Sequence, residues 1–282
     1  AAGASLDLHI RALDQIVDFG STTSVTNMVG ASQVLGLTEL LSREADGYTI
    51  GCSAFAGSII QPAMGNTDYT VDDFRPIVAL NEPTCNIILA KPGSDVDTWE
   101  GLKDRLLNGD TVYYTTNNVG AVPHIAFLSM LDQLGTTNAE LVSFDGAAAC
   151  ATAVMGGHVD IAILDIGPSA NYGKEGTLVN VLTVAEERSP ILPDSPSAGE
   201  VGFEGMDAFA GFIWVTVSKD MPEPIVEFLR EKITAALESD EYKEFLATQN
   251  ETVEQFMGEE EINARLAEAA AMYNDIFTRV DM

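Results

Sequence analysis

The sequence predicts an α/β protein whose sheets are mainly parallel. Strand-like and helix-like segments alternate along its 282 residues, and hydrophobic residues make up 46% of the chain. Small polar residues also gather at several points where a strand is followed by a helix. Alternation of this kind favours parallel strands joined by helical crossovers. The length suggests two domains or a single large one, with enough apolar surface for a sizeable core.

The first third of the chain already shows this alternation. Leu6, Ile10, Leu13 and Val17 recur at helical spacing and predict a helix over residues 5–18. The other helices predicted in this part cover residues 33–43, 54–63 and 99–107. The predicted strands cover residues 24–26, 47–51, 74–80 and 86–90.

The same rhythm continues to the end of the chain. Strands are predicted at residues 111–114, 140–143, 160–164, 178–184 and 212–217, and helices at 122–134, 146–155 and from Pro168 and Ser169 onward. Three helices should follow the last strand. Pro222 and Pro224 suit the start of the first, Ser239 is the expected N-cap of residues 240–249, and residues 258–280 carry an apolar face.

Charge excludes several kinds of partner. With 43 acidic and 14 basic residues the formal net charge is −29, which argues against binding to nucleic acid or an anionic membrane surface. Such a surface is either simply well solvated or suited to a salty environment. No apolar run approaches the roughly 18 residues of a membrane span, so we expect a soluble chain. No secretory signal is visible in the given sequence, which we expect to be a mature or truncated product, so the compartment cannot be read from a targeting segment.

The sequence does not predict a metal site, a cofactor or an enzyme. The histidines lie far apart without ligand spacing, and the cysteines are expected to be buried free thiols. Gly51-Cys52-Ser53 superficially resembles a nucleophile corner, yet no base can be identified for Cys52. Familiar catalytic and phosphate-binding motifs are also missing from the sequence.

Three corners with small polar residues are candidates for an anion site. They are residues 1–5, residues 51–54 and residues 115–120, each expected just before a helix. The first turn of a helix offers backbone N–H groups and a positive dipole end, which suit an anion, although any one corner could be merely a tight turn. Between Arg105 and Lys174 the chain has no lysine or arginine, so an anion held there must be held by dipoles.

An ordered series of segments carries a family resemblance along essentially the whole chain. The segments are AAGASLD at 1–7, VTNMVGAS at 25–32, DGYT at 46–49, YTVDDFRPI at 69–77, TTNNVGAVPH at 115–124, GGHVD at 156–160, DIGPS at 165–169 and RSPILPDSP at 188–196. Together they resemble the solute receptors of tripartite tricarboxylate transporters, the TctC or Bug group. The order of the series is far more specific than any one motif.

The resemblance implies a type II-like, two-lobed periplasmic binding protein that closes like a flytrap. It would be periplasmic or surface-anchored, monomeric and free of cofactors. It would bind a small carboxylate between its lobes, namely a dicarboxylate, tricarboxylate, acidic amino acid or aromatic acid, and deliver it to a membrane permease. A sensory module for a signalling partner and, less favoured, a carboxylate-processing enzyme are the alternatives. The expected lobes are 1–91 with 212–282, and 92–211, with crossover strands at 86–90 and 212–217.

The resemblance also implies site residues, because receptors of this group grip one ligand carboxylate with the loop after the first strand and the loop matching 115–120. The predicted ligand-binding residues are Gly3, Ala4, Ser5, Ser53, Thr115, Thr116, Asn117, Asn118, Gly120, His124, Asp165, Pro168 and Ser169. His124 could instead be structural, and Asp165 could simply cap the next helix.

Three departures from the family pattern are visible. Ala4 replaces the family's second loop glycine, and Phe144-Asp145-Gly146 stands where many relatives have Tyr-Lys-Gly. The family's proline-rich first strand lies before the start of this sequence.

Overall fold

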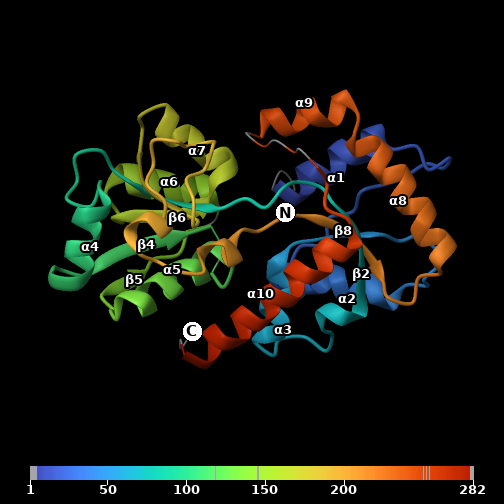
Figure 1. Ribbon diagram of the computed structural model, residues 1–282, viewed down its shortest axis with the longest axis horizontal. Coiled ribbons are helices and arrows are strands. Elements are labelled where there is room, and N and C mark those ends of the chain that lie inside the picture. Colours follow the sequence, from blue (N-terminus) through green and yellow to red (C-terminus); the bar gives the residue numbers. More distant parts are fainter. Residues whose placement is uncertain are drawn as a thin grey trace. The chain divides into compact units, whose positions relative to one another are not determined.

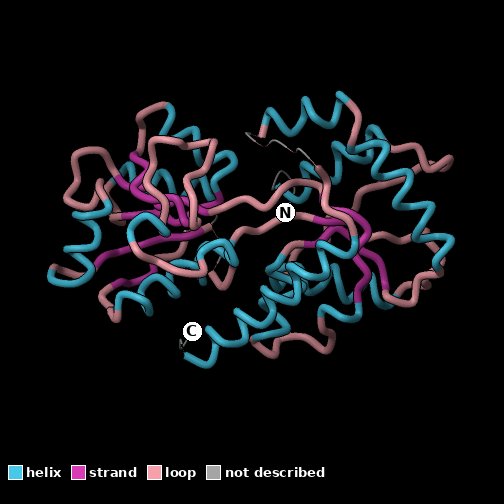
Figure 2. The backbone as a smooth tube through the Cα atoms, in the orientation of Figure 1, coloured by secondary structure: helices cyan, strands magenta, loops and turns pink. Residues whose placement is uncertain are grey.

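The structure is a computed structural model that describes residues 5–117, 119–144, 146–249, 251, 253 and 255–279, except for the side chain of Pro168. The chain forms two compact units. Of the described residues, the first unit contains those up to Pro83 and those of Phe212–Phe277, and the second contains those of Thr84–Gly211 together with Thr278 and Arg279. The chain therefore passes from one unit to the other at three points, after Pro83, after Gly211 and after Phe277. Each unit has its own sheet with helices packed against it (Figures 1 and 2).

The sheet of the first unit has three strands in the order β1 (Gly51–Ser53), β8 (Trp214–Ser218) and β2 (Phe74–Ala79). β8 lies in the centre and runs antiparallel to both neighbours. Four of its five residues are buried, as expected for a strand that is covered on both faces. The mainly parallel arrangement predicted from the sequence is therefore wrong for this unit.

Helices from both ends of the chain cover this sheet. They are α1 (Ser5–Ile16), α2 (Val34–Ser42), α3 (Gln61–Ala63), α8 (Glu223–Leu237), α9 (Asp240–Thr248) and α10 (Glu259–Arg279). Leu13 of α1, Leu229 of α8 and Tyr242 of α9 share one apolar cluster with Val215 and Val217 of β8. In Figure 1 the blue α1 accordingly lies beside the orange α8 and α9. The predicted N-cap of α9 is confirmed, because the Ser239 hydroxyl accepts from the N–H of Tyr242.

Two predicted strands of the first unit differ from the structure. Residues 24–26 form no strand. The strand predicted at residues 47–51 begins only at Gly51. Before it, the Asp46 side chain accepts a hydrogen bond from the N–H of Tyr48, which is 88% exposed. In this local turn the N–H of Tyr48 is bonded to a side chain and is not available to pair with a neighbouring strand.

A left-handed turn precedes α2. Ala31, Ser32 and Gln33 have φ values of 44°, 51° and 80°, although none of them is glycine. A left-handed conformation costs a side-chain-bearing residue roughly 1–2 kcal/mol, so the turn is expensive for three residues in a row. After β1 the chain enters a second uncommon feature, a π-helical segment at Ala56–Ile60, which continues into α3.

The second unit contains a mixed sheet in the order β5 (Ala139–Leu141), β4 (Val112–Thr116), β6 (Ile161–Asp165), β3 (Asn86–Ala90) and β7 (Val179–Val184). β4 is parallel to β5 and β6, whereas β3 is antiparallel to both β6 and β7. β3 thus lies inside this sheet, although the predicted lobe boundary after residue 91 placed it in the other lobe.

Four longer helices accompany this sheet in the described part of the second unit. They are α4 (Trp99–Asn108), α5 (Val122–Leu134), α6 (Ala147–Gly156) and α7 (Ile166–Lys174). Val154 of α6 and Ala170 of α7 pack in a cluster with Ile87 and Leu89 of β3. No helix among the described residues is both long enough and apolar enough to span a membrane.

Candidate functional site

The best candidate site lies at one edge of the sheet in the second unit. β5, β4 and β6 run in the same direction, so their carboxyl ends, at Leu141, Thr116 and Asp165, meet the same edge. Each strand is followed by a helix, namely α6, α5 and α7. Ligands of open α/β sheets bind outside the carboxyl ends of such strands.

The starts of these helices suit an anion. The N-cap residues are Ala121 for α5, Gly146 for α6 and Asp165 for α7, and none of them caps its helix with a side-chain hydrogen bond. Backbone N–H groups in the first turn of a helix have no partner within that helix. The positive end of the helix dipole adds to their attraction for negative charge.

Asn117 and Asp165 join two of the strand ends. The Asn117 amide Nδ2 donates to Asp165 Oδ2 at 2.8 Å, and the Asp165 side chain is exposed. Asp165 is also the N-cap residue of α7, so the structure leaves both its binding role and its capping role open. The pair therefore places an amide and a carboxylate together at the edge where β4 and β6 end.

The two threonines before Asn117 are buried. Thr115 Oγ1 donates to Cys150 Sγ of α6 at 3.3 Å, and the residue is fully buried. Thr116 Oγ1 donates to Asn117 Oδ1 at 3.4 Å. Thr115 thus packs β4 against α6, whereas Thr116 helps to orient the Asn117 amide.

His124 fixes the turn between β4 and α5. Its Nδ1 accepts the N–H of Gly120 at 3.0 Å, and its Nε2 lies 3.2 Å from the Tyr114 hydroxyl. Because an N–H can only donate, the ring proton must lie on Nε2 and point to Tyr114. Burial lowers the pKa of His124 and raises the pKa of Tyr114 to about 12. This geometry favours the structural interpretation of His124.

Position 120 favours glycine because of its backbone conformation. Its φ is +74°, a region that side-chain-bearing residues rarely adopt, while a Cβ added there would meet no atom within 4 Å. The described protein atoms therefore leave free the space through which a ligand is predicted to approach the backbone at Gly120.

The remaining predicted residues of this edge lie in or beside α7 and the turn before α5. Ser169 is buried in the first turns of α7, and Pro168 belongs to the same helix. Asn118 lies outside the described residues. Asn117, Gly120, His124, Asp165 and Ser169 are thus associated with the strand ends of a single sheet edge.

The first unit contains a second polar corner at the end of β1. The Ser53 hydroxyl is fully buried and hydrogen-bonds the Ser58 hydroxyl. The N–H of Ala54 donates to Gln33 Oε1 at 3.2 Å. The sequence predicted Gln33 as the first residue of the helix 33–43, and no local pattern indicated its contact with Ala54.

Hydrogen bonds of His9 connect the first turn of α1 to Glu251, which belongs to another part of the same unit. The Ser5 hydroxyl lies 3.4 Å from Nδ1 of His9, which donates to the Ser5 carbonyl at 2.8 Å. His9 Nε2 lies 2.9 Å from Glu251 Oε2, and both side chains are buried. Gly3 and Ala4 lie outside the described residues.

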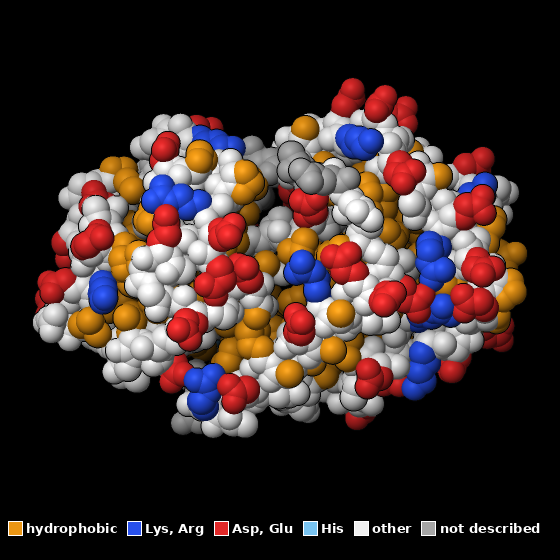
Figure 3. All heavy atoms as spheres, viewed as in Figure 1, with side chains coloured by type: hydrophobic (Ala, Val, Ile, Leu, Met, Phe, Trp, Pro, Cys, Tyr) orange, Lys and Arg blue, Asp and Glu red, His pale blue; other side chains and the backbone are white. Residues whose placement is uncertain are grey.

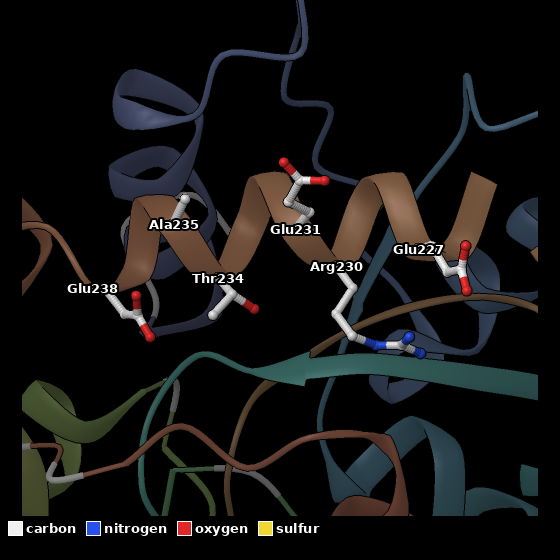
Figure 4. Close-up of a pocket in the computed structure, with 6 residues that line it drawn as sticks. All are labelled: Glu227, Arg230, Glu231, Thr234, Ala235 and Glu238. Carbon is white, nitrogen blue, oxygen red and sulfur yellow. The ribbon is translucent and has the colours of Figure 1, made fainter. Parts of the chain in front are cut away.

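Two surface hollows in the described part of the structure lie away from these corners. One, beside α8, is lined by Glu227, Arg230, Glu231, Thr234, Ala235 and Glu238. Figure 4 shows that Arg230 and Glu231 extend to opposite sides of this helix. The other hollow is lined by the start of α10 with Glu259, Glu260 and Glu261. Glutamates from a single helix repel an anion, and neither hollow is a candidate carboxylate site.

Metal binding and thiol chemistry find no support in the described residues. No group of three or more histidine, cysteine, aspartate or glutamate side chains among them could hold a metal ion. The three cysteines are free thiols; Cys150 is buried as expected, whereas Cys52 and Cys85 are only partly buried. Desolvation nevertheless raises the pKa of Cys52. A thiol kept protonated in this way is a poor nucleophile.

Comparisons with known proteins agree with this architecture. The family model of the tripartite tricarboxylate transporter family receptor, TctC, matches residues 11–278. A UPF0065 protein from the TAR-I ttuE-ttuC' intergenic region of Agrobacterium vitis is 28% identical over 84% of this chain and 69% of its own length.

Solved structures show the same fold. A TctC solute-binding protein from Polaromonas has a TM-score of 0.80 at 24% identity, covering 99% of this chain and 96% of its own. MatC from Rhodopseudomonas palustris with bound malate has a TM-score of 0.81 at 22% identity, covering 98% and 95%. The fold is therefore the two-lobed α/β fold of periplasmic binding proteins. This chain belongs to the TctC family of tripartite tricarboxylate transporter receptors, which are periplasmic solute-binding proteins and not enzymes.

Proposed function

We propose that this protein binds a small carboxylate and delivers it to the membrane permease of a tripartite tricarboxylate transporter. The observation that carries the proposal is the convergence of three helix starts at one sheet edge, in a stretch without lysine or arginine from residue 106 to 173. Family membership and the malate held by MatC support the same class of ligand.

The dipoles of the helix starts can supply the positive charge that, in the absence of lysine and arginine, no side chain of this stretch provides. Each helix start carries the equivalent of roughly half a positive charge. Three of them, from α5, α6 and α7, are together sufficient to balance one carboxylate. Because fixed dipoles replace mobile cations, we expect affinity to fall only modestly as salt increases.

Asp165 adds a preference to this site. A carboxylate beside the binding edge repels a second negative charge but accepts a hydrogen bond from a hydroxyl or ammonium group. Its partner Asn117 holds it in place at 2.8 Å. The favoured ligand therefore has a donor group close to one of its carboxylates, as in hydroxy acids and amino acids.

A melting-temperature screen tests the proposal. The probes are malate, adipate, citrate, glutamate and benzoate, which represent the candidate classes. An acid present at 100 times its dissociation constant should stabilise the protein by about 2.7 kcal/mol. If none of these acids raises the melting temperature, the proposed ligand class is wrong.

A matched pair of variants then locates the site. Asn117→Ala removes an amide that is bonded to an aspartate at the candidate edge, and Asn108→Ala removes an exposed amide bonded to Asp104 at the end of α4. Calorimetric titration with the best acid should show a loss of about 1.5–3 kcal/mol only for Asn117→Ala. Equal affinities in the two variants would remove Asn117 from the site.

Delivery requires its own measurement. Transport of the best acid into vesicles that contain the permease should depend on addition of this protein. A protein that binds the acid without supporting such transport would favour a sensory role.

A further inference from the structure

The imidazole ring of His124 connects two parts of the candidate edge. Its Nδ1 accepts the N–H of Gly120 at 3.0 Å, and its Nε2 donates to the Tyr114 hydroxyl, which lies 3.2 Å away. The two aromatic rings also stack, with centroids 6.1 Å apart and an interplanar angle of 27°. Only 6% of His124 and 3% of Tyr114 are exposed. Both ring nitrogens are therefore used, one toward the turn before α5 and one toward β4.

Packing does not fix the turn that His124 holds. Gly120 has φ +74°, and a Cβ added there would meet no described atom within 4 Å. Val119 before it is 54% exposed, and Ala121 after it makes no side-chain cap for α5. Glycine also has more conformational freedom than any other residue. The hydrogen bond to His124 therefore restrains a turn that the surrounding side chains leave free.

This turn leads into donors that suit a carboxylate. Pro123 has no N–H, so the first turn of α5 offers the backbone N–H groups of Val122 and His124. Because Gly120 lies only two residues before Val122, the direction of the turn determines where these donors point. His124 thus supplies one donor from its backbone and orients the turn with its side chain.

The titratable side chains of α5 and of the elements packed around it provide no free charge for a protonated ring. They are Tyr114 of β4, Asp165 of β6, Asp207 of the short helix η5 (Met206–Phe209) and Asp132 of α5 itself. The three carboxylates are bonded to other groups, namely the Asn117 amide, the N–H of Glu186 and the Arg279 guanidinium. Among the described residues, the hydrogen-bond partners of the ring are uncharged.

Protonation would break the connection to Gly120. The neutral ring has one N–H, which lies on Nε2, whereas the charged ring carries a second on Nδ1. Two N–H groups would then face each other across 3.0 Å. Burial lowers the pKa of His124, so the ring is neutral at pH 7. The turn consequently keeps its direction at neutral pH and loses its restraint in acidic solution.

We propose that His124 is a positioning residue for ligand binding, which orients the start of α5 for a carboxylate only while its ring is neutral. This inference rests on the proposed function, in which the start of α5 is one of the groups that bind the carboxylate. Affinity should then be highest at neutral pH. Below the pKa of His124 in the folded protein, affinity should fall about tenfold for each pH unit, because the fraction of neutral ring falls by that factor.

Calorimetric titration at a series of pH values tests this role. The probe is malate, adipate, citrate, glutamate or benzoate, whichever binds most tightly at about pH 7.5. In His124→Asn the asparagine oxygen can still accept the N–H of Gly120 but cannot titrate. The ratio of wild-type to variant affinity cancels the titration of the probe itself. We expect this ratio to be constant at neutral pH and to fall about tenfold per pH unit below the pKa of His124.

His158→Asn is the control, because His158 is exposed in the same unit. Its affinity should follow that of the wild type at every pH. Circular dichroism at each pH identifies the range in which all three proteins are folded. Within that range, a loss of stability alone does not change the affinity of the folded protein.

The wild-type protein gives an independent measurement, should His124→Asn not fold. By linkage, a ligand that binds best when the ring is neutral must lower the pKa of His124. Simple attraction between a bound carboxylate and the ring would raise this pKa instead. NMR titration of the His124 ring, with and without saturating probe, should therefore show a downward shift.

Two kinds of result would overturn the inference and leave the proposed function intact. One is an affinity ratio that stays constant through the pKa that NMR gives for His124, whether or not the variant binds more weakly throughout. The other is a pKa of His124 that the bound probe leaves unchanged or raises. If none of the five acids binds the wild-type protein at neutral pH, the proposed function fails together with the inference.

Discussion

His124 illustrates how one side chain can organise a binding corner without touching the ligand. It connects the N–H of Gly120, in the turn before α5, with the hydroxyl of Tyr114 on β4. Both bonds require the neutral ring with its proton on Nε2. Protonation of Nδ1 would place two donors face to face at Gly120 and would bury a charge, which is costly.

Acidification should therefore weaken the fold through His124. Its pKa is lowered by burial, so its contribution to stability is complete above the unfolded value of about 6.5 and decreases as the pH falls toward the folded pKa. In His124→Asn, the asparagine oxygen can still accept the N–H of Gly120 but cannot titrate. We expect its unfolding free energy to decline less than that of the wild type between about pH 6.5 and 5.

Urea unfolding at a series of pH values measures this difference. The control is His158→Asn, because His158 is exposed in the same unit. Identical pH dependence in His124→Asn and the wild type would show that His124 is not the titrating group. At neutral pH, His124→Asn should cost about 1–3 kcal/mol, because the buried Tyr114 hydroxyl loses its partner.

At the scale of helices and strands, the sequence predicts the bounds of an element accurately when local residues mark both of its ends. The helix Val122–Leu134 is predicted with its observed bounds. Pro123 suits its first turn, and Gly135, with φ 66°, ends it in the left-handed conformation. Val25 and Thr26 carry β-branched side chains, yet residues 24–26 form no strand, since a strand also needs a partner that the local sequence does not specify.

Other features could not be predicted because no local residue encodes them. The direction of β3 depends on its entry into a sheet between β6 and β7, and a buried apolar run looks the same in either direction. The left-handed turn at Ala31, Ser32 and Gln33 has no glycine within it to indicate a positive φ. The contact of Gln33 with Ala54 was missed for the same reason.

The link from α1 to Glu251 predicts a large effect on stability. His9 is fully buried, with Nδ1 bonded to the Ser5 carbonyl and Nε2 to Glu251. Removal of one partner of a buried pair leaves the other without compensation and costs about 3–5 kcal/mol. We therefore expect His9→Leu to lower the unfolding free energy by about this amount. Adding Glu251→Leu should recover most of the loss.

Urea denaturation of the two single variants and the double variant measures the coupling. Arg43→Leu is the control, because Arg43 and Glu39 form an ion pair with both side chains at least 36% exposed, and such pairs contribute about 0–1 kcal/mol. A loss in His9→Leu no larger than that in Arg43→Leu would show that the buried pair does not anchor α1.

For the whole molecule, the excess of acidic residues is the dominant property. The formal charge is −29, and acidic side chains outnumber basic ones on the face shown in Figure 3. Repulsion among these charges destabilises the compact state. Salt weakens this repulsion, because the screening length falls from about 30 Å at 0.01 M to about 8 Å at 0.15 M.

The melting temperature should accordingly rise with sodium chloride, most steeply at low concentration. Scanning calorimetry from about 0.01 M to 0.5 M salt measures the rise. Sodium sulfate at equal ionic strength is the control. Screening alone gives the same shift for both salts, whereas exclusion from the surface favours sulfate. A melting temperature that stays constant over this range would show that charge repulsion does not limit stability.

The central position of β8 also determines when each unit can be completed during synthesis. Gly51 of β1 pairs with Thr216 of β8, so the first sheet needs strands from distant parts of the chain, blue and orange in Figure 1. The second sheet is complete at Val184. A chain emerging from the ribosome can therefore fold the second unit first. Until β8 has been synthesised, β1 and β2 have no strand between them. Closing the long loop that brings β8 into this position is expected to be a slow step in folding. The amides of β4 and β6 should gain protection from hydrogen exchange before those of β1 and β2.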